Sequence, residues 1–522
     1  MFANPKTRSL CYLLPVALFL FLVGRFWHPV YGFTSFLTMD AQTKFTRIAA
    51  VRETPVFLST APGSYDGQFY AQLAYHPLLN SPEIAPAMDS YAYRARRILP
   101  SMIAWALAGG NPNLIFNAYC VVNVLAWLAL SAILWRLLEV RSARTWTAWV
   151  GVMFSAGALF SVGRALTDLV ALAFVAGALL VASRGRKLAS ALTLSAAALC
   201  KETSLFSAVD LLVPDSDQAA GRRRRSLLSR VWLCCVAAAP LVAWALYVRW
   251  RVGPAHDEWG NFTWPFAAFL SKWASSVRDV YPSDDLLLTV TTLLTLAGLT
   301  FQAVYLAVTF ERGDRWSRLG AAYLPLMAVV STSVWEGFPG AACRVLLPMT
   351  LAFNLLVARR KAHLAWILIG NLTVLSGLLF LKDVPENETE YSTSRSTAGV
   401  AILNLGDGWY GPEANSSHHW LWTAKSGELL VRYWRQSRSD GTIRFSIRSI
   451  TPRTVTITEG DKVVWSHLVS SDPMTFSVTF PVIQSRADLR FSSEAEPTRT
   501  PGDVRALNFE VYDPVIVLRS EP

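Results

Sequence analysis

Acidic and basic side chains stand beside long apolar segments of this chain, where charges are costly and their placement is informative. One segment after the first apolar run holds Asp66, and a second holds Arg94, Arg96 and Arg97. Arginine binds phosphate through paired hydrogen bonds, and a nearby carboxylate can act as a general base toward a hydroxyl group. The combination predicts a site for a phosphate-bearing substrate with an acid–base residue beside it.

Three later points in the chain repeat the pattern of one cation with one carboxylate. The pairs are Arg164 with Asp168, Lys201 with Glu202, and Arg344 with Glu336. We expect all three on the same membrane side as the first loop, so together they predict one mouth lined with cations. Salt-bridged pairs that only cap helix ends are the alternative, which explains a single pair more readily than the whole set.

Apolar helices must position these side chains. The chain has 522 residues, of which 52% are hydrophobic and 16% charged, against about 25% charged in a soluble domain. Apolar windows predict about eleven crossings of a membrane. The windows are approximately 9–26, 113–138, 145–163, 165–183, 187–200, 202–214, 229–250, 284–310, 319–335, 342–358 and 363–381. The windows 187–200 and 202–214 are short, and must either both cross or both stay on one side.

The net charge of +11 would suggest a nucleic-acid partner in a soluble protein. Here the basic residues occupy every second loop between the windows, as the positive-inside rule requires. The pattern places the N-terminus in the cytoplasm and the C-terminus outside, and leaves no charge that calls for nucleic acid. The arginines and lysine of the predicted mouth are the exception, because they lie on the outer side.

Residues from about 383 onward change from continuous apolar runs to alternation. Ile443, Phe445 and Ile447 alternate with polar residues, and so do Phe476 and Phe480 around Val478. Alternation over short runs separated by turn residues is typical of antiparallel strands. We therefore expect a multi-span helical domain over 1–382, with an outer loop at 27–112, and an extracytoplasmic all-β sandwich over 383–522.

A resemblance supports the reading of the first loop. The runs Tyr65-Asp66-Gly67-Gln68-Phe69-Tyr70 and Tyr93-Arg94-Ala95-Arg96-Arg97 resemble the first outer loop of bacterial GT-C glycosyltransferases, multi-span enzymes that use polyprenyl-phosphate-linked sugars. Segments around Asp168, Lys201 and Arg344 fit the same group, and the tail resembles a β-sandwich often appended to such enzymes. The resemblance covers most of the chain and is carried by the set of motifs.

The resemblance implies a catalytic carboxylate in the first outer loop, which by position is Asp66. Asp40 is the rival base, because it lies nearer the first window, although no aromatic residue or motif surrounds it. The donor phosphate would bind to Arg94, Arg96, Arg97, Arg164, Lys201 and Arg344. Contacts with the sugar or acceptor would come from Tyr65, Gln68, Tyr70, Asp89, Asp168, Glu202 and Glu336. Enzymes of this group differ in their use of Mg²⁺ or Mn²⁺, and no ligand spacing here selects a metal.

The function expected from these observations is transfer of a sugar from a polyprenyl-phosphate donor to a glycan, lipid or protein hydroxyl outside a bacterial inner membrane. Two alternatives stay open. A transporter or flippase of lipid-linked sugars should carry polar residues near the bilayer midplane, reachable from both sides. A glycan-binding membrane protein without catalysis would leave the outer charges of the helical part without a role.

Overall fold

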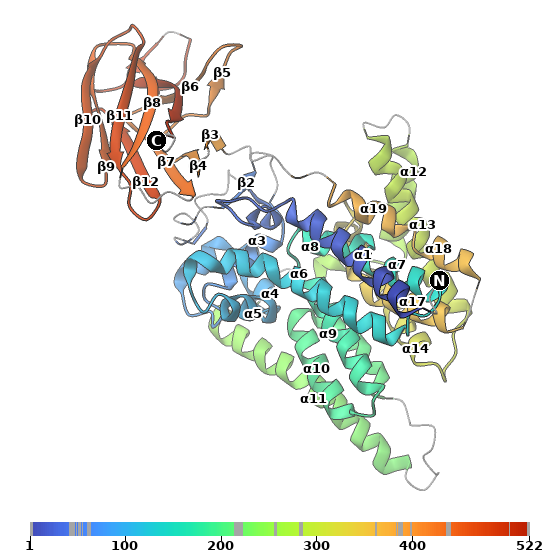
Figure 1. The fold of residues 1–522 in the computed structure, drawn as a ribbon. Coiled ribbons are helices and arrows are strands. Elements are labelled where there is room, and N and C mark those ends of the chain that lie inside the picture. Colours follow the sequence, from blue (N-terminus) through green and yellow to red (C-terminus); the bar gives the residue numbers. More distant parts are fainter. Residues whose placement is uncertain are drawn as a thin grey trace.

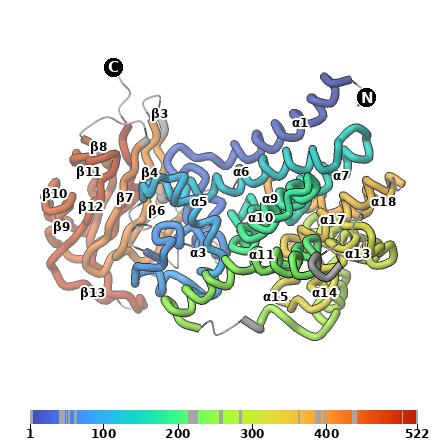
Figure 2. Tube along the Cα trace, turned by 90° about the horizontal axis from the view of Figure 1, so that it is seen from below, coloured from blue at the N-terminus to red at the C-terminus, as the bar shows by residue number. Residues whose placement is uncertain are grey.

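The structure is a computed structural model (Figure 1). It describes residues 4–40, 47–48, 50, 54, 56–59, 64–212, 223–254, 258–280, 285–360, 363–382, 384, 390–396, 399–434, 440–500 and 502–518. Figures 1 and 2 show two parts, a large helical part and a smaller part made of strands. The helices end and the strands begin on either side of the predicted division at 382/383.

The helical part contains helices of very different lengths. The first loop region carries α3 (Gly67–Leu73), α4 (Tyr91–Ala95), α5 (Leu99–Leu107), the 3-10 helices η1 (Thr34–Leu37) and η3 (Pro82–Ala87), and the short parallel pair β1 (Met39–Asp40) and β2 (Leu58–Ser59). Around it lie α1 (Pro5–Gly24), α6 (Pro112–Leu137), α7 (Ala143–Met153), α8 (Ala156–Gly163), α9 (Thr167–Ala182), α10 (Lys187–Cys200), η4 (Glu202–Asp210) and α11 (Arg223–Val252). The remaining helices are η6 (Glu258–Asn261), α12 (Ala267–Arg278), α13 (Leu286–Val308), α14 (Arg315–Val329), α15 (Thr332–Trp335), α16 (Ala342–Val345), α17 (Leu347–Arg359), α18 (Leu364–Gly370) and α19 (Thr373–Leu379).

Five helical segments among the described residues are long and apolar enough to cross a membrane. They are Pro5–Gly24, Pro112–Leu137, Ala143–Gly163, Leu227–Val252 and Leu286–Val308. The expectation of about eleven crossings is therefore not supported. The window 202–214 begins as a 3-10 helix, α9 and α10 have only 16 and 14 residues, and about 20 are needed to span the hydrocarbon core.

Breaks in the backbone explain why two further windows give no long helix. The window 319–335 is interrupted at Val330, whose extended backbone (ψ 140°) separates α14 from α15. The window 363–381 is interrupted at Asn371 and Leu372, between α18 and α19. Apolar composition predicts burial in both windows, but it does not reveal where a helix stops.

The helix α1 lies along α6 in an antiparallel direction (Figure 2). Phe19 stacks on Trp127 with ring centroids 3.7 Å apart, and Tyr12 lies 4.9 Å from Trp135. The opposite face of α1 is apolar and exposed, with Leu14 at 64%. An apolar face without a protein neighbour is what a helix presents to lipid.

The strands form two antiparallel sheets packed face to face, which confirms the predicted β-sandwich in outline. The six-stranded sheet has the order β10-β9-β12-β7-β4-β3 and the five-stranded sheet the order β11-β8-β15-β6-β5. Their strands are β3 (Glu390–Ser396), β4 (Gly399–Leu405), β5 (Glu413–Ala414), β6 (His419–Thr423), β7 (Ser426–Trp434), β8 (Asp440–Ser449), β9 (Arg453–Glu459), β10 (Lys462–Val469), β11 (Met474–Pro481), β12 (Arg486–Ser492) and β15 (Phe509–Ile516), with a separate pair β13 (Thr498–Arg499) and β14 (Ala506–Leu507). Ile443, Phe445 and Ile447 are buried between the sheets, as their alternation predicts.

The sandwich contacts the first loop region of the helical part. Tyr31 and Phe57 form a small apolar cluster with Val400 and Ile402 of β4. The phenol of Tyr31 also lies 3.4 Å from Oδ1 of Asn404. The same loop region that carries Asp66 is thus covered in part by the sandwich.

Candidate functional site

Asp66 stands directly before α3, where the chain passes very close to another turn. A Cβ atom at Gly67 would lie 2.2 Å from the carbonyl oxygen of Arg164, in the turn between α8 and α9. Only glycine permits this approach without a shift of the backbone. The Asp-Gly pair therefore brings the first loop against the start of α9, where Asp168 lies.

The carboxylate of Asp66 lies between two arginines from distant parts of the chain. Its Oδ1 accepts a hydrogen bond from Nη2 of Arg94 at 2.9 Å, and its Oδ2 accepts one from Nη2 of Arg344 at 3.1 Å. Arg94 also binds Asp89 through Nε at 3.0 Å and through Nη2 at 2.6 Å. Arg94 is thus shared by two carboxylates of the first loop region.

Arg344 connects the first loop to α9. Its Nη1 donates to Oδ2 of Asp168 at 2.9 Å, while its Nη2 binds Asp66. Lys201 pairs with the other oxygen of Asp168. The side chain of Asp168 is only 1% exposed, and a buried carboxylate needs such partners to stay charged.

Arg97 forms a further ion pair, with η4. Its Nε donates to Oε2 of Glu202 at 2.9 Å. Its Nη1 and Nη2 donate to the phenol oxygens of Tyr70 at 3.1 Å and Tyr93 at 2.7 Å. The phenol of Tyr70 also lies 3.4 Å from Nη1 of Arg94, so it links the two arginines.

A cavity of about 390 Å³ opens beside these ion pairs. Two carboxylates, Asp66 and Glu202, line it together with five cations, which are Arg94, Arg96, Arg97, Lys201 and Arg344. A wall of apolar side chains completes the lining, with Phe262, Leu326, Val330, Val334 and Val345. Among the described residues, the cavity combines an excess of positive charge with an apolar surface.

Two buried polar atoms of the lining residues have no hydrogen-bond partner in the described part of the chain. They are Oε1 of Glu202 and Nε of Arg344. Buried polar groups are nearly always hydrogen-bonded, so such exceptions call for an explanation. A polar ligand in the adjoining cavity would supply the missing partners.

The electrostatic environment keeps the carboxylates of the cavity ionised. Burial acts to raise the pKa of Asp66, but the guanidinium groups of Arg344 and Arg94 outweigh it and hold that pKa below its usual value. Burial opposes ionisation of Glu202 in the same way, and Arg97 lowers its pKa. In this arrangement Asp66 is a weak base, because its charge is already neutralised by two cations.

The structure brings most of the predicted site residues together, but it pairs them differently from the sequence prediction. Asp168 pairs with Lys201 and Arg344 rather than with Arg164, and Glu202 pairs with Arg97 rather than with Lys201. Adjacent residues at a helix end point in different directions, so the charges meet across elements.

Four predicted residues take other positions. Arg164 is beside the cluster and donates to Oγ1 of Thr38 at 2.7 Å, without lining the cavity. Glu336 is exposed and does not line the cavity either. Gln68 is buried and does not line the cavity. The side chain of the rival base Asp40 lies outside the described residues, although its backbone belongs to β1.

Tyr65 and Tyr70 support the cluster without lining the cavity. The ring of Tyr65 lies 5.8 Å from the guanidinium carbons of both Arg344 and Arg164. Tyr70 accepts from Arg94 and Arg97, as described above. Both tyrosines therefore hold arginines in place, and neither lines the cavity.

Several lining residues escaped the sequence prediction. Tyr93 was visible only as part of the motif around Arg94, and its hydroxyl proves to bind Arg97. Asn261, Phe262 and Ser333 line the cavity from η6, the residue after it, and α15. No local pattern signals them, because they reach the cavity through an isolated backbone bridge between Phe262 and Val330.

The carboxylates of the cluster do not suit a divalent metal. Among the described residues, no three His, Cys, Asp or Glu side chains are grouped as metal ligands. Both carboxylate oxygens of Asp66 and of Asp168 bind Arg or Lys, and one oxygen of Glu202 binds Arg97. Mg²⁺ and Mn²⁺ need several free oxygen ligands. We therefore derive no step through a metal.

No protein-family model and no curated protein matches the chain. A solved structure titled "CBM4 structure and function" matches 22% of this chain and 85% of its own chain, at 12% sequence identity and a TM-score of 0.16. A similarity this low supports no conclusion about fold or function.

Proposed function

We propose that the chain is a membrane glycosyltransferase, which moves a sugar from a polyprenyl-phosphate donor to a hydroxyl group of an extracytoplasmic glycan, lipid or protein. The observation that carries the proposal is the cavity in which Asp66 and five cations face an apolar wall. Each part of that lining matches one part of such a donor.

The cations match the phosphate of the donor. Five basic side chains against two carboxylates leave the lining with an excess of positive charge. Arg94, Arg97 and Arg344 offer planar guanidinium groups, which bind phosphate oxygens in pairs. The unpartnered Nε of Arg344 is one donor available for this purpose.

The apolar wall matches the polyprenyl chain. Leu326 belongs to α14, Val345 to α16, and Val334 to α15. A sugar phosphate without a lipid would leave these side chains facing water, at a cost of roughly 25 cal/mol for each Å² exposed. A donor with an isoprenoid tail covers them.

Asp66 would act as the general base once the donor is bound. A donor phosphate beside Arg94 and Arg344 competes with Asp66 for their hydrogen bonds, and the pKa of Asp66 then rises toward its usual value. Asp66 takes the proton of the acceptor hydroxyl, whose oxygen attacks the anomeric carbon. The bond from that carbon to the phosphate oxygen breaks, and polyprenyl phosphate leaves with its charge stabilised by the arginines.

The test uses the purified full chain and a panel of polyprenyl-phosphate sugars with varied acceptors. Wild type should release free polyprenyl phosphate from at least one donor, and Asp66→Asn should not. Asp89→Asn is the matched control, because Asp89 also binds Arg94 but does not line the cavity; it should retain most of the activity. If no combination of donor and acceptor gave free polyprenyl phosphate, the proposal that the chain is an enzyme would be rejected. If Asp66→Asn were as active as wild type, only the assignment of Asp66 as the base would be rejected, and Asp40 would be tested next.

A transporter of lipid-linked sugars is the second candidate, and one observation favours it. Polar side chains lie inside the helical part, far along the chain from the first loop, at Gln302, Thr350, Asn354 and Asn371. They bond to one another, with Asn354 Nδ2 2.9 Å from Asn371 Oδ1 and Thr350 Oγ1 2.8 Å from Gln302 Oε1. Movement of a fluorescent lipid-linked sugar across vesicles, without release of polyprenyl phosphate, would favour transport over transfer.

A further inference from the structure

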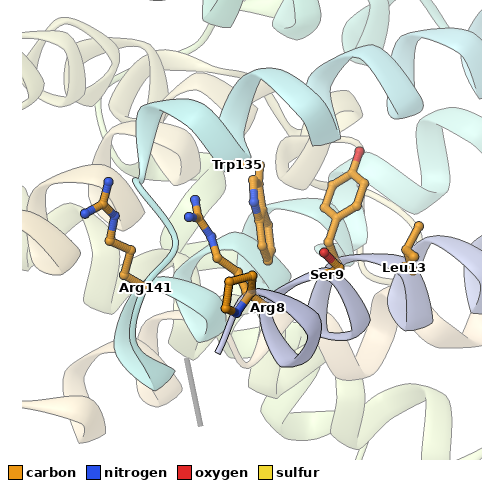
Figure 3. Close-up of a pocket in the computed structure, with 7 residues that line it drawn as sticks. Arg8, Ser9, Leu13, Trp135 and Arg141 are labelled. Atoms are coloured by element: carbon orange, nitrogen blue, oxygen red, sulfur yellow. The ribbon is translucent and has the colours of Figure 1, made fainter. Parts of the chain in front are cut away.

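A second pocket lies at the opposite end of α1 from the first loop. Its lining includes Arg8, Ser9, Tyr12, Leu13, Trp135 and Arg141, and its volume is about 860 Å³ (Figure 3). The helix α1 has 20 residues and leads into the first loop at its other end. At 1.5 Å per residue it is about 30 Å long, the thickness of a bilayer core. This pocket therefore cannot be part of the cavity beside Asp66.

The pocket presents positive charge without a counter-charge. Arg8 and Arg141 are the charged residues of its described lining, and both are cations. Figure 3 shows the two side chains extending in the same direction, with the indole of Trp135 beside Arg8. The Nε of Arg8 is buried and donates to no group in the described part of the chain. The cavity beside Asp66 differs, because carboxylates as well as cations line it.

Exposed leucines of α1 lie in the lining of the pocket and next to it. Leu13 is 55% and Leu14 64% exposed on α1, and these side chains would contact acyl chains in a membrane. The rings of Tyr12 and Trp135 pack together in the wall, with centroids 4.9 Å apart. Aromatic residues with a polar atom are enriched where lipid chains meet headgroups.

We propose that this pocket binds the phosphate of an anionic phospholipid from the surrounding bilayer. Arg8 and Arg141 would donate charge-assisted hydrogen bonds to its oxygens, and an acyl chain would lie along Leu13 and Leu14. A basic pocket whose lining includes the exposed Leu13 suits a headgroup attached to a lipid tail. The inference depends on the proposed membrane location, and does not depend on the proposed reaction.

Native mass spectrometry of the full chain in mixed micelles tests this site. Wild type should retain phosphatidylglycerol in preference to phosphatidylcholine. One arginine near an anionic lipid contributes about a fivefold change in affinity, so the double variant R8Q/R141Q should bind phosphatidylglycerol about 25-fold more weakly. R186Q, in the exposed basic turn before α10, is the matched control and should bind as wild type. R8K/R141K keeps both charges and should retain most of the binding.

Three results would overturn the proposal. Equal retention of phosphatidylglycerol by wild type and R8Q/R141Q would show that the lipid binds elsewhere. Thermal stabilisation by inorganic phosphate, lost in R8Q/R141Q and not exceeded by phosphatidylglycerol, would assign the pocket to a soluble anion. Release of wild type from membranes by alkaline carbonate would remove the membrane location, and the transferase proposal with it. The first two results leave the transferase proposal intact.

Discussion

Two buried polar regions of the helical part invite comparison. The charged cluster around Asp66, Arg94 and Arg344 consists of ions and borders a cavity. The neutral network of Gln302, Thr350, Asn354 and Asn371 consists of amides and one hydroxyl between α13, α17 and the turn after α18. Both hold distant helices together, but only the first combines charge, an open cavity and unpartnered polar atoms.

The difference lies in what each region leaves unsatisfied. In the neutral network Asn371 Nδ2 binds Asn354 Oδ1 and the carbonyl of Ile367, and Gln302 Nε2 binds the carbonyl of Gly370. Such reciprocal bonds are typical of interhelical packing in membrane proteins. In the charged cluster, Glu202 and Arg344 keep an unused polar atom each beside the cavity. Polarity alone therefore does not mark a site, whereas charge with unmet hydrogen-bonding capacity does.

The largest expected effect that separates the two regions is on turnover. Asp66→Asn should lower the release of polyprenyl phosphate by about 10²–10⁴-fold, the usual contribution of a general base. Its fold should persist, because Asn can still accept from Arg94. Circular dichroism and thermal unfolding in detergent would check the fold, and steady-state kinetics the rate. A loss below tenfold would place the base elsewhere.

A second prediction concerns the stability of the charged cluster. Arg344→Gln leaves the buried Asp168 with Lys201 alone and Asp66 with Arg94 alone. Loss of one partner of a buried pair costs about 3–5 kcal/mol, so the melting temperature should fall markedly. Arg344→Lys keeps the charge but can reach only one carboxylate, so its melting temperature should lie between those of wild type and Arg344→Gln. Equal melting of all three proteins would contradict the assigned ion pairs.

Mutation of the neutral network should lower stability by less than mutation of the charged cluster, and it should leave activity unchanged. Asn354→Leu removes two hydrogen bonds from Asn371, at about 1 kcal/mol within a bilayer. The double variant Asn354→Leu/Asn371→Leu would recover part of that loss, because no amide is left unpaired. Transferase activity per folded molecule should be unchanged. If it fell as far as in Asp66→Asn, the network would belong to the substrate path.

The smallest expected effect is on the pH dependence of stability. The pKa values of Asp66 and Glu202 are lowered in the folded chain, and their unfolded values are about 3.9 and 4.3. Their contribution is therefore complete above roughly pH 5 and is lost as the pH falls through the lowered folded values. Melting temperatures between pH 7 and pH 3 should fall less in Asp66→Asn than in wild type. Asn354→Leu removes no titrating group, so its melting temperature should fall with pH as steeply as that of wild type.

Features that depend on local residue patterns could be predicted from the sequence. The helices α1 and α6 arise where apolar residues continue for a membrane width, and β8 arises where Ile443, Phe445 and Ile447 alternate with polar residues. The glycine after Asp66 belongs to the run that carries the resemblance, and the structure gives a reason for it, because a Cβ atom there would lie 2.2 Å from the carbonyl oxygen of Arg164.

The rest depends on long-range geometry that the sequence does not contain. Hydropathy could not distinguish a span from the 3-10 helix η4, or reveal the interruption of α14 at Val330. Membership of Arg94, Arg97, Lys201 and Arg344 in one cluster could be predicted, because ions in an apolar chain must meet. The carboxylate that each of these cations binds could not be predicted, because the ion pairs join residues up to 278 positions apart.

The long connection made by Arg344 has a consequence for biosynthesis. During synthesis Asp66 and Asp168 are made well before α16, and the two carboxylates lack their common guanidinium until that helix has been made and has packed against them. A chain that stops before Ala342 holds the first loop and α9 without the ion that joins them. Truncated products therefore lack the complete charged cluster even when every residue of the first loop has been made, and the cluster can form only when the helical part is nearly complete.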